Sequence, residues 1–98
     1  MGKRKVTILD PATDGVAEAA YFIEGKGMSQ TAKKFVDGVF EFCAGLADER
    51  IEHRPCIYPL WKKLHYRCVT YKKYTVAYIL YKDEIVICEF VPSKQIHW

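Results

Sequence analysis

The chain has 98 residues, half of them hydrophobic, and its 15 Lys and Arg against 12 Asp and Glu give a formal net charge of +3. This length closes one hydrophobic core and excludes two domains, so we expect a single domain over residues 1–98. A charge of +3 is too small for a protein that coats nucleic acid, so any contact with a polyanion must be local. No apolar run approaches the ~20 residues of a membrane span, and we expect no membrane partner.

The N-terminal half is typical of one strand followed by two helices. Residues 5–9 form a short apolar strand, and Asp10-Pro11 then supplies a capping residue and a proline suited to the first turn of a helix. Gly25 and Gly27 end this helix, and a second one is predicted from Ser29 to about residue 47. Apolar residues recur at helical spacing in both, as Val16, Ala19, Ala20 and Ile23, and as Ala32, Phe35, Val36, Val39, Cys43 and Leu46. The short connection predicts an antiparallel helical hairpin.

The C-terminal half changes to the pattern of strands. Residues 48–63 show no period and contain Pro55 and Pro59, which predicts a loop with at most one short strand. Runs rich in β-branched and aromatic residues follow at 66–71, 74–81 and 84–91, and two short polar turns separate them. Both faces of the middle run are apolar, which indicates a central strand. The sequence thus predicts an α+β fold: a strand, a helical hairpin and a three-stranded antiparallel meander, with the helices packed on one face of a four-stranded sheet.

Positive charge gathers in the predicted sheet region. Residues 54–81 contain six Lys or Arg and no Asp or Glu, among many Tyr, Trp, Val and Ile residues. A basic, aromatic-rich sheet surface favours contact with nucleic acid. The candidate nucleic-acid-binding residues are Lys62, Lys63, Arg67, Lys72, Lys73 and Lys94. The alternative is that lysines at strand ends only keep a sheet edge soluble.

The cysteines indicate no disulfide framework and no metal site. They stand at Cys43, Cys56, Cys68 and Cys88. They form no C-x-x-C pair, and no signal peptide precedes them, so we expect reduced, buried thiols in a cytoplasmic protein. Combining two of them with His53 and His65 gives no zinc-finger spacing, and no phosphate-binding or dinucleotide-binding glycine motif is present. We therefore expect neither a metal nor a cofactor.

The strand pattern resembles a known family of bacterial toxins. The segment from Tyr66-Arg67 through Tyr74-Thr-Val-Ala-Tyr78, followed by residues 82–87, is similar to the C-terminal sheet of the RelE/ParE superfamily. The two helices after a short first strand agree, so the resemblance covers nearly the whole chain. It implies the toxin of a type II toxin–antitoxin (plasmid stabilisation) system. Such a toxin is held inactive by an antitoxin whose C-terminal segment wraps its helices and sheet.

The superfamily divides by mechanism. One branch cleaves messenger RNA on the ribosome, and a ParE-like branch poisons DNA gyrase without chemistry of its own. The resemblance implies ribosome-dependent mRNA cleavage as the first expectation for this chain. Gyrase binding, or an inactive relative that still binds an antitoxin, is the alternative. The ribosome with its mRNA, or DNA gyrase, is accordingly the expected target.

RNA cleavage by 2′-hydroxyl attack requires a proton acceptor, cations for the phosphate and an acid for the departing oxygen. The resemblance implies that Arg67 is the catalytic cation and that His97 or Tyr71 transfers protons. Arg67 can instead form an ion pair within the sheet, and His97 can belong to a simple tail. Thr75 occupies the position where the cleaving branch usually has an arginine, which argues against cleavage.

Two aromatic residues of the second predicted helix lie off its apolar stripe. Phe40 and Phe42 thus leave apolar surface that a second chain can cover. We expect this surface to contact the cognate antitoxin. The alternative is a homodimer that forms through the same patch without the antitoxin.

Overall fold

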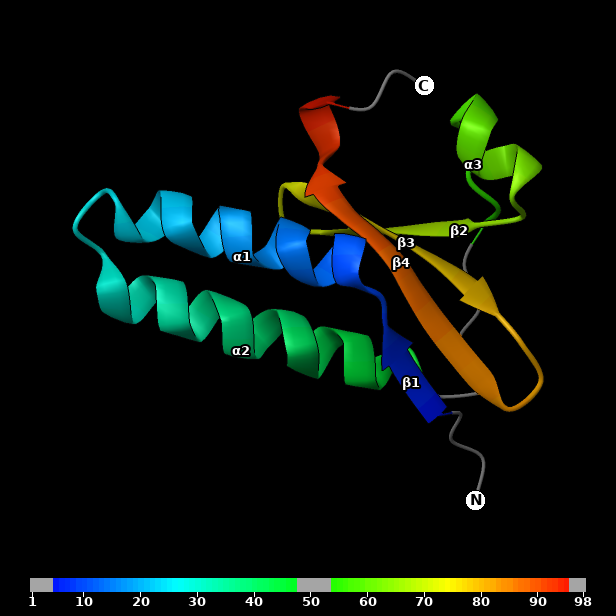
Figure 1. Ribbon diagram of the computed structural model, residues 1–98, viewed down its shortest axis with the longest axis horizontal. Helices are drawn as coiled ribbons and strands as arrows, with labels where there is room; N and C mark the ends of the chain where they lie inside the picture. Colours follow the sequence, from blue (N-terminus) through cyan, green and yellow to red (C-terminus); the bar gives the residue numbers. More distant parts are fainter. Residues whose placement is uncertain (1–4, 48–53, 96–98) are drawn as a thin grey trace.

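The computed structural model describes residues 5–47 and 54–95 (Figure 1). Its elements, in chain order, are β1 (Lys5–Ile8), α1 (Asp10–Glu24), α2 (Ser29–Gly45), α3 (Pro59–Lys63), β2 (Arg67–Tyr71), β3 (Tyr74–Leu80), β4 (Glu84–Pro92) and a short 3-10 helix, η1 (Ser93–Gln95). The four predicted strands agree with these bounds within one residue at each end, and both predicted helices are present. The α3 helix differs from prediction, because it lies in the region predicted as a loop.

The four strands form one sheet in the order β1-β4-β3-β2. The last three strands are antiparallel neighbours and make the predicted meander, with β3 in a central position. The first strand pairs in parallel with β4, so that Val6 lies opposite Ile85 and Ile8 lies opposite Ile87. The predicted four-stranded α+β architecture is therefore confirmed.

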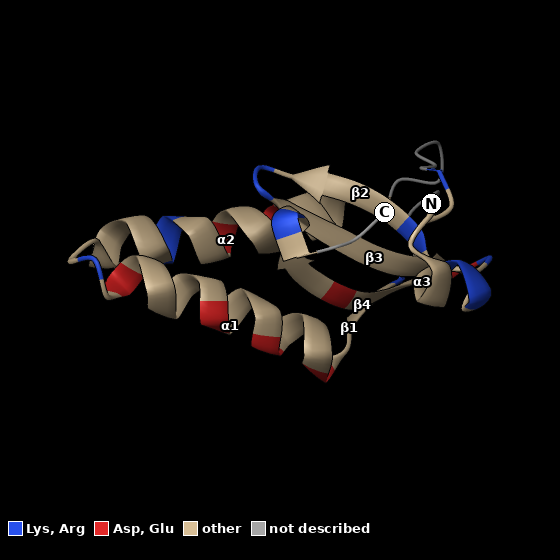
Figure 2. Cartoon of the chain, turned by 90° about the horizontal axis from the view of Figure 1, so that it is seen from above, with Lys and Arg blue, Asp and Glu red and all other residues tan. Residues whose placement is uncertain are grey.

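The helical hairpin packs on one face of this sheet (Figure 1). The main core lies between them, because one face of each helix is apolar and alternate strand residues point toward the helices. Its buried members include Val16, Phe35 and Val39 from the helices, and Tyr78 and Phe90 from the strands. The α1–α2 turn extends beyond the sheet, at the end of the molecule away from α3 (Figures 1 and 2).

The closest approach of α1 to the sheet is at Gly15. A Cβ atom placed there would collide with the carbonyl oxygen of Phe90 and lie 3.1 Å from the carbonyl carbon. The colliding group is backbone, so it cannot rotate away as a side chain does. The absence of a side chain at Gly15 thus sets the distance between α1 and β4.

We expect Gly15→Ala to lower the free energy of unfolding by about 2 kcal/mol, because the overpacking cost exceeds the gain in helix propensity of roughly 1 kcal/mol. The matched control is Gly45→Ala. A Cβ at Gly45 meets nothing within 4 Å, so this change should be neutral or slightly stabilising. Urea denaturation followed by circular dichroism measures both. Equal effects of the two substitutions would contradict the close helix–sheet contact.

The opposite face of the sheet carries a second, smaller cluster. The residues of β3 alternate between faces, so Val76 and Tyr78 belong to the main core whereas Ala77 belongs to the second cluster. There the α3 residue Trp61 is buried with Cys56. The predicted one-sided arrangement therefore holds for the helical hairpin, while α3 covers part of the other face.

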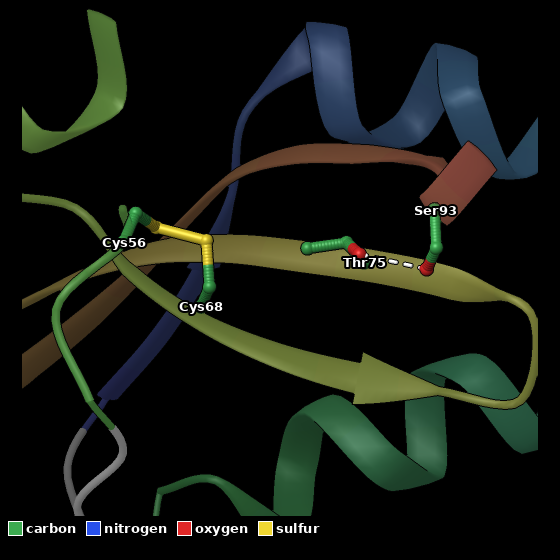
Figure 3. The surroundings of a disulfide bond; sticks show 4 residues. All are labelled: Cys56, Cys68, Thr75 and Ser93. Carbon is green, nitrogen blue, oxygen red and sulfur yellow. Dashed lines mark hydrogen bonds between the residues drawn. A yellow bond between two sulfur atoms is a disulfide. The ribbon is translucent and has the colours of Figure 1, made fainter. Parts of the chain in front are cut away.

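A disulfide joins Cys56 to Cys68 (Figure 3). The prediction that all four cysteines are free is thus wrong for this pair, while Cys43 and Cys88 are free and buried. The pairing follows from tertiary structure. Residues 54–56 run beside the start of β2, where the Cys56 N–H donates to the Tyr66 carbonyl at 2.9 Å and the Cys68 N–H donates to the Arg54 carbonyl at 3.2 Å.

Candidate functional site

The main candidate site is a groove of about 960 Å³ between α1, the β2–β3 turn and η1. Four lysines line it, and Glu18 is the one acidic residue among its described lining residues. We call this the basic groove; its lysines are Lys26, Lys72, Lys73 and Lys94. Aromatic and apolar side chains, including Phe22 and Tyr74, line the rest. Such a lining attracts an anionic ligand and offers it apolar contact.

Backbone contacts bring these lysines together. The β2–β3 turn contains only Lys72 and Lys73, and Lys72 has a left-handed backbone with φ of 54°. The Ser93 N–H donates to the Lys73 carbonyl at 2.9 Å, which ties η1 to this turn. Lys94, the next residue, is therefore held at the same end of the sheet. The turn and η1, which are distant in sequence, thus form one basic cluster with a defined geometry.

Thr75 lies beside this cluster and is 2% exposed. Its hydroxyl is 2.8 Å from the Ser93 hydroxyl, and the two make a hydrogen bond (Figure 3). A buried, neutral threonine hydroxyl therefore occupies the β3 position where the resemblance would place an arginine. The hydrogen-bonded pair of hydroxyls holds η1 against β3, and it brings no positive charge to a reacting phosphate.

The other predicted basic residues lie at the opposite end of β2. Lys62 and Lys63 are exposed on the last turn of α3, and Arg67 begins β2. Arg67 is half-buried, pairs in register with Tyr78, and already has an interaction within the protein. The predicted nucleic-acid-binding residues thus form two groups separated by the length of β2: one at the β2–β3 turn and η1, the other at α3 and the start of β2, and both regions carry blue segments in Figure 2.

The predicted proton-transfer and partner-binding residues lie elsewhere. Tyr71 faces α2, and its ring centroid is 4.8 Å from that of Phe42, so it helps to hold β2 against α2. This contact leaves Phe42 half-buried, whereas Phe40 is 41% exposed. His97 lies outside the described residues. Tyr71, Phe40 and Phe42 are not among the described residues that line the basic groove.

Three ionisable groups gather on the face of the sheet that carries α3. Burial raises the pKa of the Glu89 carboxyl and of the Cys88 thiol above their ordinary values. Burial, with the neighbouring Cys88, also raises the pKa of Tyr66. All three shifts favour the protonated form, so burial limits the negative charge that these groups bring to this face.

No metal centre or membrane-crossing helix is found in the described part of the chain. Within residues 5–47 and 54–95, no three His, Cys, Asp or Glu residues are placed to hold a metal ion. The disulfide also removes two thiols from the zinc set considered above. None of the described helices is long and apolar enough to cross a membrane.

Sequence reasoning missed the contribution of α1 to the site. Glu18, Phe22 and Lys26 line the basic groove, yet none of them belongs to the predicted apolar stripe. The available signal was the helical spacing itself, because these residues are four apart and therefore share one face. Their position beside the β2–β3 turn depends on how α1 crosses the sheet, which the spacing does not specify.

A helical hairpin on a meander sheet with a parallel first strand is a RelE/ParE-like fold, and the comparison with solved structures agrees. The chain is similar to a chain of the chromosomal ParDE toxin–antitoxin system from P. aeruginosa, with a TM-score of 0.76 and 14% identity. The match covers 94% of this chain and 98% of that chain. No protein-family model and no curated protein matches the sequence. The predicted resemblance is thus confirmed at the level of the fold.

Proposed function

We propose that this chain is the toxin of a type II toxin–antitoxin pair and that it arrests growth by binding its target, not by cleaving RNA. The RelE/ParE-like fold and its similarity to a ParDE chain support the toxin assignment. The observation that carries the mechanism is Thr75, a buried hydroxyl bonded to Ser93 where the cleaving branch has a cation. A cognate antitoxin is the expected partner.

The chemistry of the basic groove supports binding. Cleavage needs an acid and a base beside the phosphate, but the described lining of the groove contains no His or Cys and a single carboxylate, Glu18. Lysines and hydroxyls suit the recognition of phosphate groups without reaction. By the division within the superfamily, the target of a binding toxin is DNA gyrase. We propose that the basic groove contacts the polyanionic part of the gyrase–DNA complex in the cytoplasm.

Ribosome-dependent mRNA cleavage is the second candidate. Lys62 and Lys63 are exposed near the start of β2, and Arg67 begins that strand, so cations are available away from the basic groove. In this candidate His97 or Tyr71 would transfer the protons. This candidate predicts new RNA ends that depend on translation.

Inducible expression in a bacterial host, with RNA integrity and plasmid supercoiling followed in parallel, separates these functions. We expect growth arrest, filamentous cells and altered DNA supercoiling without new RNA ends. Translation-dependent RNA ends that disappear with His97→Ala or Arg67→Ala would instead establish cleavage. Normal growth at full expression would show that the chain is an inactive relative.

The double variant Lys72→Ala/Lys73→Ala tests the basic groove. We expect about tenfold weaker inhibition of purified gyrase, because two exposed charge contacts contribute roughly 0.5–1 kcal/mol each. The slope of the logarithm of the binding constant against the logarithm of salt concentration should also become shallower by about one per lysine. The matched control, Lys33→Ala/Lys34→Ala, removes two exposed charges from α2 outside the groove. Equal losses in both variants would contradict a role for the groove.

A further inference from the structure

The outer face of α1 carries large aromatic side chains that nothing covers in the described structure. Tyr21 is 78% exposed and Phe22 is 62% exposed, and both lie in the last turn of α1. The buried residues of α1, including Val16 and Ala19, contact the core. Tyr21 is on the far side of the helix from them, and Phe22 is at the flank, where it also lines the basic groove. Adjacent exposed aromatic residues of this kind mark an interaction surface.

Two rows of residues at a spacing of four make up this surface, and together they line a shallow cavity of about 640 Å³. One row has a small residue on each side of an aromatic one, and the other has an acid and a base on either side of an aromatic one. They are Ala17, Tyr21 and Gly25, and Glu18, Phe22 and Lys26, of which the last three also line the basic groove. We call these six residues the α1 face.

The rows continue past the end of the helix. Gly25, the C-cap residue, keeps a helical backbone with φ of −62° and ψ of −17°. The Lys26 ammonium lies 4.5 Å from the centre of the Phe22 ring. Lys26 is therefore on the same side of the helix as Phe22, one turn further along, just as Glu18 lies one turn before it.

This arrangement is complementary to itself. When two copies of α1 cross in antiparallel orientation about a two-fold axis at Phe22, Glu18 of each copy meets Lys26 of the other. The two small residues, Ala17 and Gly25, allow the helices to approach at either side of Tyr21. In a two-fold interface each contact between the two copies occurs twice. Glu18 and Lys26 are each four residues from Phe22, so the axis at Phe22 brings them together in two equivalent ion pairs.

We infer that the α1 face is the interface of a two-fold homodimer of this chain, with Tyr21 and Phe22 at its centre and two intermolecular Glu18–Lys26 ion pairs beside them. Four aromatic rings that each bury roughly 150 Å² contribute about 600 Å², so the interface belongs to the small, transient class that buries less than about 1,200 Å². The dimer is therefore reversible, with a dissociation constant on the order of micromolar. This inference does not rest on the proposed toxin function.

Charge-reversal variants test the ion pairs by sedimentation velocity from about 1 μM to 1 mM, the range that spans a micromolar constant. Wild type should dimerise, whereas Glu18→Lys and Lys26→Glu alone should each weaken dimerisation at least about tenfold, as two ion pairs become two repulsions. An equimolar mixture of the two variants should dimerise again, because each acidic copy then meets a basic copy at both positions. The double variant Glu18→Lys/Lys26→Glu should also recover.

The matched control reverses a second exposed acid–base pair of the same spacing, Lys33→Glu and Asp37→Lys on α2, and should leave dimerisation unchanged. Phe22→Ser should abolish the dimer, while Phe40→Ser should not. A monomer at every concentration, or a mixture of the two variants that stays monomeric, would overturn the inference. Loss of the dimer in Phe40→Ser but not in Phe22→Ser would place self-association on α2 instead. Circular dichroism should show that each variant is folded, since all the changed side chains are exposed.

Discussion

Replacing Phe90 with alanine should lower the free energy of unfolding by about 4 kcal/mol, within the range for loss of a buried aromatic side chain. Phe90 is 2% exposed. Its ring stacks on Tyr74 with centroids 4.9 Å apart and meets the edge of Phe35 at 6.2 Å. Its neighbours are themselves packed in the main core, so removal of the ring should leave a cavity there.

Chemical denaturation of Phe90→Ala, with Phe40→Ala as the control, measures this effect. Phe40 is 41% exposed, and its removal should cost less than about 1 kcal/mol. The two substitutions delete the same atoms, so their difference reports the packing of Phe90 alone. A similar, small cost for both would mean that the core is not centred on β4.

Reducing the Cys56–Cys68 disulfide should destabilise the protein by about 3 kcal/mol. The two cysteines are 12 residues apart, and closing a loop of this length removes about that much chain entropy from the unfolded state. Thermal unfolding with and without dithiothreitol measures the effect. The double variant Cys56→Ser/Cys68→Ser should unfold at the lower temperature in both conditions.

If dithiothreitol leaves the unfolding temperature of the wild-type protein unchanged, the disulfide is contradicted.

The loop closed by this bond contains α3 and its two lysines, and the buried Trp61 anchors the same loop to the sheet. In a reducing compartment the pair is expected to exist as thiols. The position of α3 would then depend on the packing of Trp61 and the backbone hydrogen bonds of residues 54–56.

The helices and strands could be predicted because each carries a full period of apolar residues. The helix α3 could not, since five residues are too few to show a period and the burial of Trp61 depends on the far face of the sheet. The parallel pairing of β1 with β4 could not be predicted either, because the pattern of residues 5–8 does not specify the direction of this strand relative to β4. Predicting the disulfide would also require knowing which segment runs beside β2, and the sequence pattern does not show this.

The candidate site was predictable only in part. Lys72, Lys73 and Lys94 were named from charge alone, and the structure places them together because η1 is bonded to the β2–β3 turn. Tyr71 was named for proton transfer by resemblance, yet strand alternation puts it with Val69 on the helix-facing side. That signal was present in the sequence. The α1 residues of the groove were not predictable without the crossing of α1 over the sheet.

The parallel pairing of β1 with β4 determines when the protein can complete its sheet during synthesis. Lys5 pairs with Glu84, which is made 79 residues later, so at ~5–20 residues per second the first strand waits about 4–16 s for its partner. During this interval the helical hairpin has no β4 to pack against. A nascent chain therefore cannot close its sheet, or the core between the sheet and the helical hairpin, until β4 has been synthesised.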